Sequence, residues 1–364
     1  MSKSRKLGRL VGVMLALSMV ATACGGDSSS DELTPIKLQL QWVAQSQFAG
    51  YYAAVDQGFY EDEGLDVTIL EGAVEIVPQQ VLASGGAEFA ISWVPKVLAS
   101  REEGVDIVNI AQVFQRSPTL QVSWADDNIS SPNDWVGKKV GNWGFGNELE
   151  MVAALVKFGI VDQVEQVPQN FDMNGLLNRE IDAAEAMIYN EYAQLLETVN
   201  EETGELYQPS DFTYVSYEDI GTAMLQDAVW ARADWLPDNE DTAEKFLRAS
   251  FRGWIYCRDN FDACVDIVLQ NGTTLGTSHQ QWQLNEINNI IWPSPDGIGI
   301  VNQGSWDQTV QTSIDSGFIS GAPTGTVFRT DIAQKVLDDL ADDGVDVIGS
   351  GFTKRTVTLV EGGE

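Results

Sequence analysis

Short runs of alternating or continuous hydrophobic residues recur along this chain, and longer stretches with helical periodicity separate them. Residues 36–42 alternate with period two and predict the first strand, while residues 50–63 predict a helix that ends at Gly64. Further strands are predicted over residues 65–70, 88–92 and 106–114, with helices over 78–84 and 93–103. Strands that alternate with helices in this way are typical of α/β proteins with parallel strands and crossover helices.

A second series of the same kind begins after residues 126–128, where Ser130-Ser131-Pro132 is a helix start signal. It predicts strands over residues 139–143, 164–167 and 181–188 and a helix over 147–158. Near Tyr217 the chain returns to the first series, with helices predicted over 246–256 and 263–270. We therefore expect two α/β lobes, of which residues 35–125 with 218–364 form the first and residues 126–217 form the second.

The first 23 residues have the three parts of an export signal. Basic residues at positions 3, 5, 6 and 9 precede an apolar run over residues 10–20, and Ala21-Thr22-Ala23-Cys24 forms a small-residue cleavage site. The cysteine after that site indicates a bacterial lipoprotein, with Cys24 as the lipidated residue and residues 24–34 as a solvated tether. The alternative is an ordinary secretory signal with a chance cysteine. We expect a lipid-anchored protein at the extracytoplasmic face of the bacterial cell membrane, because the apolar run is too short to span a bilayer.

The chain is strongly acidic, with 54 Asp and Glu residues against 21 Lys and Arg residues. Removal of the export signal, which carries four of the 21 basic residues, would leave 17 against 54, a formal balance of −37. Nucleic acid is excluded as a partner, since phosphate binding needs a cationic surface. The acidity indicates a solvated surface suited to its medium rather than a site for a cationic ligand.

Two further cysteines, Cys257 and Cys264, lie near the end of one predicted helix and the start of the next. In an exported protein such a pair is a disulfide candidate, and the alternative is two separate buried thiols. We expect no metal site, because the single histidine, His279, stands far from both cysteines in the sequence. We also expect no cofactor.

Several segments carry a resemblance to a known family. Residues 41–67 read QWVAQSQFAGYYAAVDQGFYEDEGLDV, and weaker matches are GKKVG over 137–141, NREIDAA over 178–184 and GWIY over 253–256. Together they resemble the periplasmic-binding-protein family that captures thiamine pyrimidine precursors, riboflavin and alkanesulfonates for ABC importers. The resemblance implies the two-lobed periplasmic-binding-protein fold of type II, with hinged lobes and mixed, mostly parallel sheets that close on a small molecule. It also implies an ABC permease and an ATPase as partners.

The candidate site follows from the predicted strand ends, because ligands in open α/β sheets bind beyond the carboxyl ends of strands. Each of four such junctions carries an aromatic residue, and most have an amide or carboxylate beside it, which is the composition of a slot for a flat, hydrogen-bonding ring. The candidate ligand-binding residues are Trp42, Gln45, Phe48, Tyr51, Trp93, Trp143, Asn147, Tyr189, Asn190 and Glu191.

Each candidate also has a structural interpretation. The aromatic residues could pack in the core, Glu191 could be an acid favoured at the start of a helix, and Asn190 could cap that helix. Gly141, Gly144 and Gly146 resemble an anion-binding loop before a helix, which keeps a sulfonate ligand under consideration. Against a sulfonate, aromatic and amide residues dominate the strand ends, where we find no arginine or lysine.

Two other classes of function are considered. A eukaryotic branch of the same fold synthesises the thiamine pyrimidine, but its cysteine cluster and active-site histidine have no match in Cys257, Cys264 and His279, so we expect no enzyme activity. A structural lipoprotein would not need polar aromatic residues at sheet ends. The large aromatic set favours a fused ring such as riboflavin over a thiamine pyrimidine precursor, and a sulfonate such as taurine ranks third.

Overall fold

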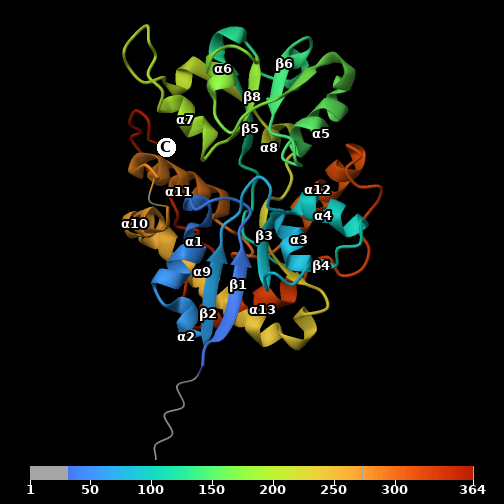
Figure 1. Cartoon of the computed structure of the whole chain (residues 1–364), viewed down its shortest axis with the longest axis vertical. Coiled ribbons are helices and arrows are strands. Elements are labelled where there is room, and N and C mark those ends of the chain that lie inside the picture. Colours follow the sequence, from blue (N-terminus) through green and yellow to red (C-terminus); the bar gives the residue numbers. More distant parts are fainter. Residues whose placement is uncertain (1–31, 273, 364) are drawn as a thin grey trace, which may run out of the picture. The chain divides into compact units, whose positions relative to one another are not determined.

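The computed structural model describes residues 32–272 and 274–363. The expected signal peptide and Cys24 lie outside the described residues, as does most of the expected tether. The described chain forms two lobes, each built around a five-stranded sheet with helices on its faces (Figure 1). The predicted two-lobed α/β fold is therefore confirmed.

The sheet of the first lobe has the strand order β2-β1-β3-β10-β4. These strands are β1 (Thr34–Gln39), β2 (Leu65–Leu70), β3 (Phe89–Trp93), β4 (Ile107–Gln112) and β10 (Asp227–Arg232). β1 pairs in parallel with β2 and β3, whereas β10 is antiparallel to β3 and β4. The strand predicted over residues 65–70 is confirmed as β2, and Gly64 before it adopts a left-handed backbone with φ of 75°.

The second lobe repeats this arrangement with the order β7-β6-β8-β5-β9. These strands are β5 (Thr119–Trp124), β6 (Lys139–Asn142), β7 (Glu165–Pro168), β8 (Ala183–Met187) and β9 (Phe212–Ser216). β6 is parallel to β7 and β8, and β5 is antiparallel to β8 and β9. Each sheet thus contains one strand, β10 or β5, that is antiparallel to both of its neighbours, so both sheets are mixed as expected.

The chain crosses between the lobes at places other than those expected. The first crossing lies between β4 and β5, before Thr119, because β5 belongs to the second sheet. The expected boundary after residue 125 was wrong, since the pattern of a buried strand does not reveal which sheet the strand joins. The return lies between Ile220 and Asp227, because Tyr217 still packs in the core of the second lobe.

Helices cover both sheets. Those of the first lobe are α1 (Ala49–Asp56), α2 (Phe59–Asp62), α3 (Pro78–Ala83), α4 (Val94–Glu102), α9 (Glu240–Asp259), α10 (Phe261–Asn271), α11 (Thr277–Ile291), α12 (Gln303–Asp315) and α13 (Thr330–Asp342). Those of the second lobe are α5 (Leu149–Phe158), α6 (Asn174–Leu177), α7 (Glu191–Leu196) and α8 (Tyr217–Ile220). The single helix predicted over residues 50–63 is divided at Gly58, whose φ is 71°. None of the described helices is long and apolar enough to cross a membrane.

The core of the first lobe depends on a close contact between α1 and α9. Gly50 and Gly253 face each other there, and the ring of Trp254 packs edge-on against Tyr51 with a centroid separation of 5.6 Å. Tyr51, Trp254 and Phe48 are all buried. The GWIY segment that the sequence singled out is thus part of a helix contact.

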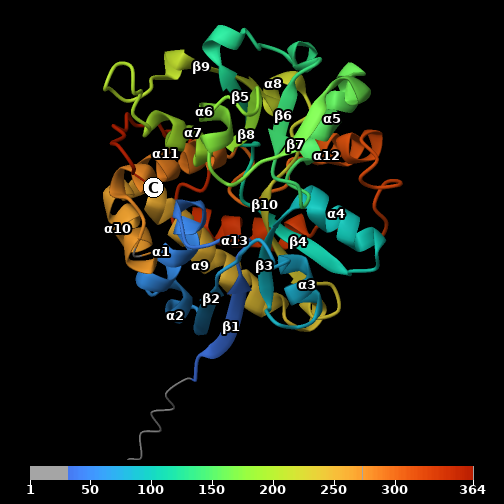
Figure 2. The ribbon, with the colours of Figure 1, turned by 45° about the horizontal axis from the view of Figure 1, so that its top comes forward.

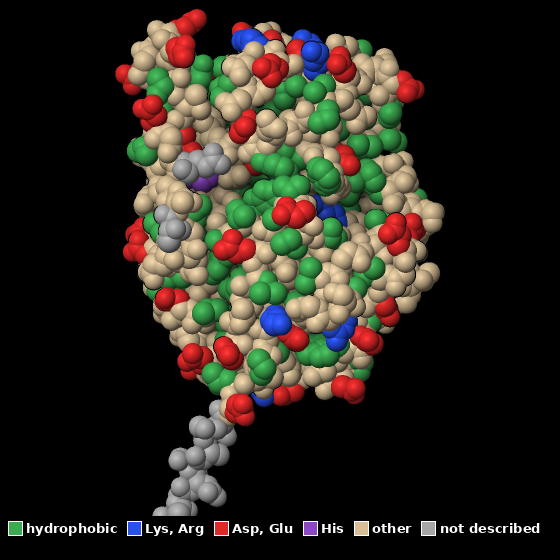
Figure 3. All heavy atoms as spheres, in the orientation of Figure 1, with side chains coloured by type: hydrophobic (Ala, Val, Ile, Leu, Met, Phe, Trp, Pro, Cys, Tyr) green, Lys and Arg blue, Asp and Glu red, His purple; other side chains and the backbone are tan. Residues whose placement is uncertain are grey.

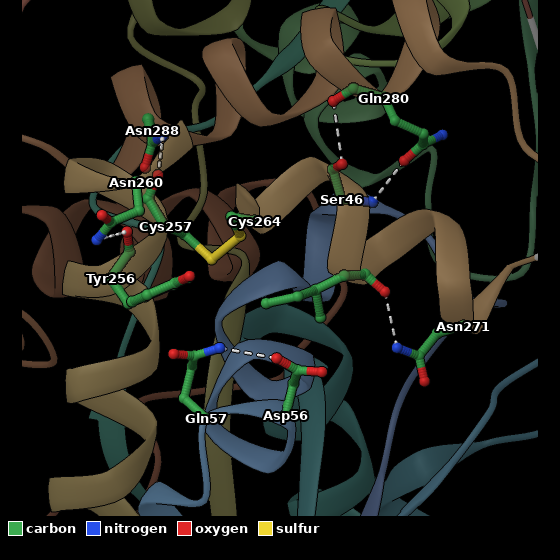
Figure 4. The surroundings of a disulfide bond; sticks show 11 residues. Ser46, Asp56, Gln57, Tyr256, Cys257, Asn260, Cys264, Asn271, Gln280 and Asn288 are labelled. Carbon is green, nitrogen blue, oxygen red and sulfur yellow. Dashed lines mark hydrogen bonds between the residues drawn. A yellow bond between two sulfur atoms is a disulfide. The ribbon is translucent and has the colours of Figure 1, made fainter. Parts of the chain in front are cut away.

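Cys257 and Cys264 form a disulfide bond between α9 and the first turn of α10 (Figure 4). Close to this bond, Ser46 joins the chain after β1 to α11: its backbone N–H donates to Gln280 Oε1 at 2.8 Å, and its hydroxyl donates to Gln280 O at 3.0 Å. These contacts hold α11 beside the region that leads into the cleft between the lobes.

Candidate functional site

A cavity of about 300 Å³ lies between the lobes. Its walls come from the chain after β1 and β3 in the first lobe, from the chain after β6 and β8 in the second, and from α11. α11 also lies beside α7 of the second lobe (Figure 1, Figure 2). In the view of Figure 3, hydrophobic side chains gather in a band between the two lobes.

Most of the predicted ligand-binding residues line this cavity. They are Trp42, Gln45, Trp93, Trp143, Asn147, Tyr189, Asn190 and Glu191. Phe48 and Tyr51 do not, so their prediction as site residues was wrong. β1 ends at Gln39, and by Phe48 the chain has turned into η1 (Ser46–Phe48) and α1, whose apolar side chains pack in the core of the first lobe.

Aromatic rings from both lobes meet across the cavity. Trp42 of the first lobe lies with its ring centroid 5.0 Å from that of Phe171 in the second lobe. Trp143 is nearly parallel to Phe171, with an interplanar angle of 15° and a centroid separation of 6.1 Å. Phe171 and the exposed Phe145 also line the cavity and were not among the predicted site residues, although Phe145 lies between Gly144 and Gly146 of the predicted glycine loop.

Asp227, at the start of β10, accepts hydrogen bonds from three side chains that line the cavity. Its carboxylate accepts hydrogen bonds from Gln41 Nε2 at 2.8 Å, Trp93 Nε1 at 2.8 Å and Gln47 Nε2 at 2.9 Å. Burial raises the pKa of Asp227 to about 7, and the hydrogen bonds from Gln47 and Trp93 oppose this shift. These bonds fix the plane of Trp93, one of the predicted stacking walls.

A row of side-chain amides connects Asp227 to the second lobe. Gln45 Nε2 donates to Gln47 Oε1 at 2.7 Å, and Gln283 Nε2 donates to Gln45 Oε1 at 2.9 Å. Gln283 also donates to Asn190 Oδ1 at 3.0 Å. Each glutamine in the row donates toward Asp227, so the carboxylate sets the orientation of the amides.

The other end of this row lies at the start of α7. Asn190 Nδ2 donates to Glu191 Oε1 at 2.9 Å, and the Met187 N–H donates to Glu191 Oε2 at 2.9 Å. His279 lies between Asn190 Oδ1 and Glu197 Oε2, at 2.9 Å from each. Both oxygens of Glu191 thus accept hydrogen bonds from within the chain, one from the Asn190 side chain and one from the end of β8. His279 lines the cavity although the sequence indicated no role for it.

The glycine loop after β6 uses three of its backbone N–H groups in hydrogen bonds within the chain. The Trp143 N–H donates to Glu185 Oε2 at 3.0 Å, the Gly144 N–H donates to Asn142 Oδ1 at 3.1 Å, and the Asn147 N–H donates to Gly144 O at 3.0 Å. Helix α5 begins only at Leu149, so Asn147 lies before the helix. The loop turns the chain with a left-handed backbone at residues 144–146.

Lys96 is a cationic residue of the cavity that the strand-end pattern did not reveal. The absence of lysine at the strand ends, which counted against a sulfonate, therefore does not extend to the cavity as a whole. It lies in α4, three residues after Trp93, and Nζ stands 4.6 Å from the centroid of the Trp93 ring. Nζ also donates to Asn147 Oδ1 of the second lobe at 2.6 Å. Helical spacing from a strand-end aromatic was the signal that could have revealed it.

Glu150 on α5 lies at the crossings between the lobes. Its carboxyl group accepts from the hydroxyl of Ser117 in the first crossing at 2.9 Å and from the N–H of Met224 in the second. Burial raises the pKa of Glu150 to about 8, against the effect of these hydrogen bonds. Within the described part of the chain, no group of three or more His, Cys, Asp or Glu residues could hold a metal ion.

A family model described as NMT1/THI5 like matches residues 45–263, which are more than half of the chain. A formylaminopyrimidine-binding protein of Halalkalibacterium halodurans is 24% identical over 269 residues, covering 72% of this chain and 78% of that protein. The riboflavin-binding protein RibY of Chloroflexus aurantiacus is 23% identical over 311 residues, covering 82% of this chain and 86% of that protein.

Two further similarities concern the fold and the enzyme alternative. The structure of a putative periplasmic sulfonate-binding protein, SsuA, of Methylobacillus flagellatus superposes with a TM-score of 0.62 at 15% identity, covering 90% of this chain and 99% of that one. A 4-amino-5-hydroxymethyl-2-methylpyrimidine phosphate synthase of Legionella pneumophila is 26% identical over only 115 residues, 31% of this chain and 36% of that protein.

Proposed function

The chain belongs to the NMT1/THI5-like family, and from this premise we propose that it is the extracytoplasmic solute-binding component of an ABC importer and captures a flat nitrogen heterocycle. The observation that carries the proposal is the cavity between the lobes, where Trp42 and Trp93 of one lobe face Trp143 and Tyr189 of the other. Rings of this kind stack on flat ligands, and amides beside them donate and accept at the ligand edge.

Riboflavin is the first candidate ligand, because the cavity offers more aromatic surface than a single pyrimidine needs. A thiamine pyrimidine precursor is the second, supported by the similarity to a formylaminopyrimidine-binding protein over most of the chain. A sulfonate ranks third, since the glycine loop uses three of its N–H groups internally. Enzyme activity is not part of the proposal, because the similarity to a synthase covers only 31% of this chain.

Replacement of Trp143 by alanine tests the site. We expect Trp143→Ala to weaken riboflavin binding about 10- to 100-fold, because loss of a stacking ring in a desolvated site costs about 1–3 kcal/mol. Titration calorimetry with riboflavin, thiamine, its pyrimidine precursors and taurine measures this effect. Tyr214→Ala on β9 is the matched control, since Tyr214 is exposed and lies outside the cavity. Binding of taurine alone by the unsubstituted protein would show that the stacking argument is wrong.

The lipid anchor is a separate part of the proposal. Cys24→Ala should leave the protein without lipid and release it from the membrane fraction, because the thiol of Cys24 is the expected site of acylation. Cell fractionation and mass spectrometry of the mature N-terminus measure the two effects. Unchanged membrane association of the variant would contradict the anchor, while ligand binding by the purified protein would be unaffected.

A further inference from the structure

Lys96 lies in an aromatic cavity without a carboxylate partner. Within residues 32–272 and 274–363, its ammonium group makes one side-chain hydrogen bond, to Asn147 Oδ1, and no ion pair. An ammonium group has three N–H donors, so two of them lack a protein acceptor. The Asn147 amide is held in place by a bond from its Nδ2 to Gly144 O at 2.9 Å, which turns its oxygen toward Lys96.

The surroundings of Lys96 disfavour the charged form of its amine. Burial lowers the pKa of Lys96 to about 8. Three carboxyl groups face it from different elements and oppose this shift: Glu148 before α5, Glu185 on β8 and Asp227 on β10. All three lie beyond ion-pair distance, and Asp227 is already engaged by Gln41, Gln47 and Trp93. A partly buried cation of this kind is stabilised most by an acceptor that binds it directly.

Trp143 also has a side-chain donor without a partner. Trp143 lines the cavity from the opposite lobe, and its indole Nε1–H is buried without a hydrogen-bond partner. The indole nitrogens of Trp135, Trp254 and Trp292 are also buried without a partner, although these residues do not line the cavity. The inference therefore rests on Lys96, whose ammonium group keeps N–H donors for a ligand in the cavity.

We propose that Lys96 binds an oxygen acceptor on the edge of the captured ring, so that the site selects heterocycles that carry a carbonyl or formyl oxygen over those that carry only amines. The inference rests on the proposed function and names the class of heterocycle. The ligand oxygen would take a charge-assisted hydrogen bond from the ammonium group, and Asn147 would keep the ammonium oriented from the second lobe.

The test compares two ligands that differ by one oxygen-bearing group. The probes are a formylaminopyrimidine and the same aminopyrimidine without its formyl group, with riboflavin as a second ligand that has ring carbonyls. We expect the unsubstituted protein to prefer the formylated ring, and Lys96→Met to lose about 10- to 100-fold affinity for it with little change for the amine. Lys245→Met is the control, because it removes the same charge from the partly exposed side of α9.

The pH dependence of the unsubstituted protein gives a measurement that needs no variant. Because the ligand oxygen binds the protonated amine, affinity for the formylated ring should fall by up to about tenfold per pH unit above pH 8, where Asp227, with its pKa of about 7, is already mostly ionised. Equal binding of both pyrimidines, or a Lys96→Met variant that keeps full affinity for the formylated ring, would overturn the inference and leave the proposed function intact. Failure of the unsubstituted protein to bind any heterocycle would overturn both.

Discussion

Asp227→Asn should weaken ligand binding about 10- to 100-fold and lower the free energy of unfolding by about 1–3 kcal/mol, because it places a donor where three donors already converge. Gln41, Gln47 and Trp93 all donate to the carboxylate. An asparagine retains one acceptor oxygen, so its NH₂ group must face one of these donors. Trp93, which has only a donor, cannot adapt by rotating an amide.

Rotation of the neighbouring amides does not relieve this conflict. If Gln47 turned its oxygen toward the new asparagine, its NH₂ group would face the NH₂ group of Gln45. Gln45 would then have to rotate its amide as well, and its NH₂ group would face that of Gln283. The row ends at Asn190, whose orientation is fixed by donation to Glu191. The mismatch therefore remains somewhere in the cavity wall, and we expect the binding loss to persist even where the protein is fully folded.

Calorimetry measures the loss of affinity, and chemical denaturation measures the loss of stability. Both are done at pH 8, where the Asp227 carboxyl group, with its pKa of about 7, is mostly ionised. Asp266→Asn on α10 is the matched control, since Asp266 is exposed and the substitution removes the same charge. Unchanged affinity in Asp227→Asn would show that the orientation of Trp93 and the amides does not matter for binding.

Gly253→Ala should destabilise the first lobe by about 3 kcal/mol, toward the upper end of the cost of overpacking a core. A Cβ atom at Gly253 would lie 2.0 Å from Gly50 O and 3.0 Å from the Cβ of Ala54, so α1 and α9 would have to separate. The loss should occur although alanine favours the helical state over glycine by about 1 kcal/mol. Denaturant titration of the purified protein measures the change.

Gly321→Ala is the control for this substitution. A Cβ atom at Gly321 would meet no atom within 4 Å, and its backbone does not require a glycine, so we expect a change close to zero. If Gly253→Ala proved as stable as Gly321→Ala, the approach of α1 to α9 would be looser than the structure indicates.

The sequence by itself determined the local elements and the class of fold. Residues 65–70 form β2 as predicted, because their alternation and the glycine before them are local signals that tertiary contacts reinforce. Most of the predicted site residues also line the cavity, because a residue just after a strand is carried to the edge of its sheet by that strand alone. Trp93 and Trp143 were found for this reason.

Only the tertiary structure decided which distant segments meet. β5 follows the first lobe in sequence yet pairs with β8 and β9, since strand pairing depends on long-range contacts that no local pattern encodes. His279 reaches the cavity from α11, and Asp227 on β10 orients residues of the cavity wall, each far along the chain from the residues that it contacts. Tyr51 does not reach the cavity and lies against Trp254, because the chain after β1 turns into α1, which packs on α9. The direction of the chain beyond a strand depends on which side chains the next helix buries against its neighbours. The free energy of that burial comes from contacts across the whole lobe, so the segment's own sequence does not determine it.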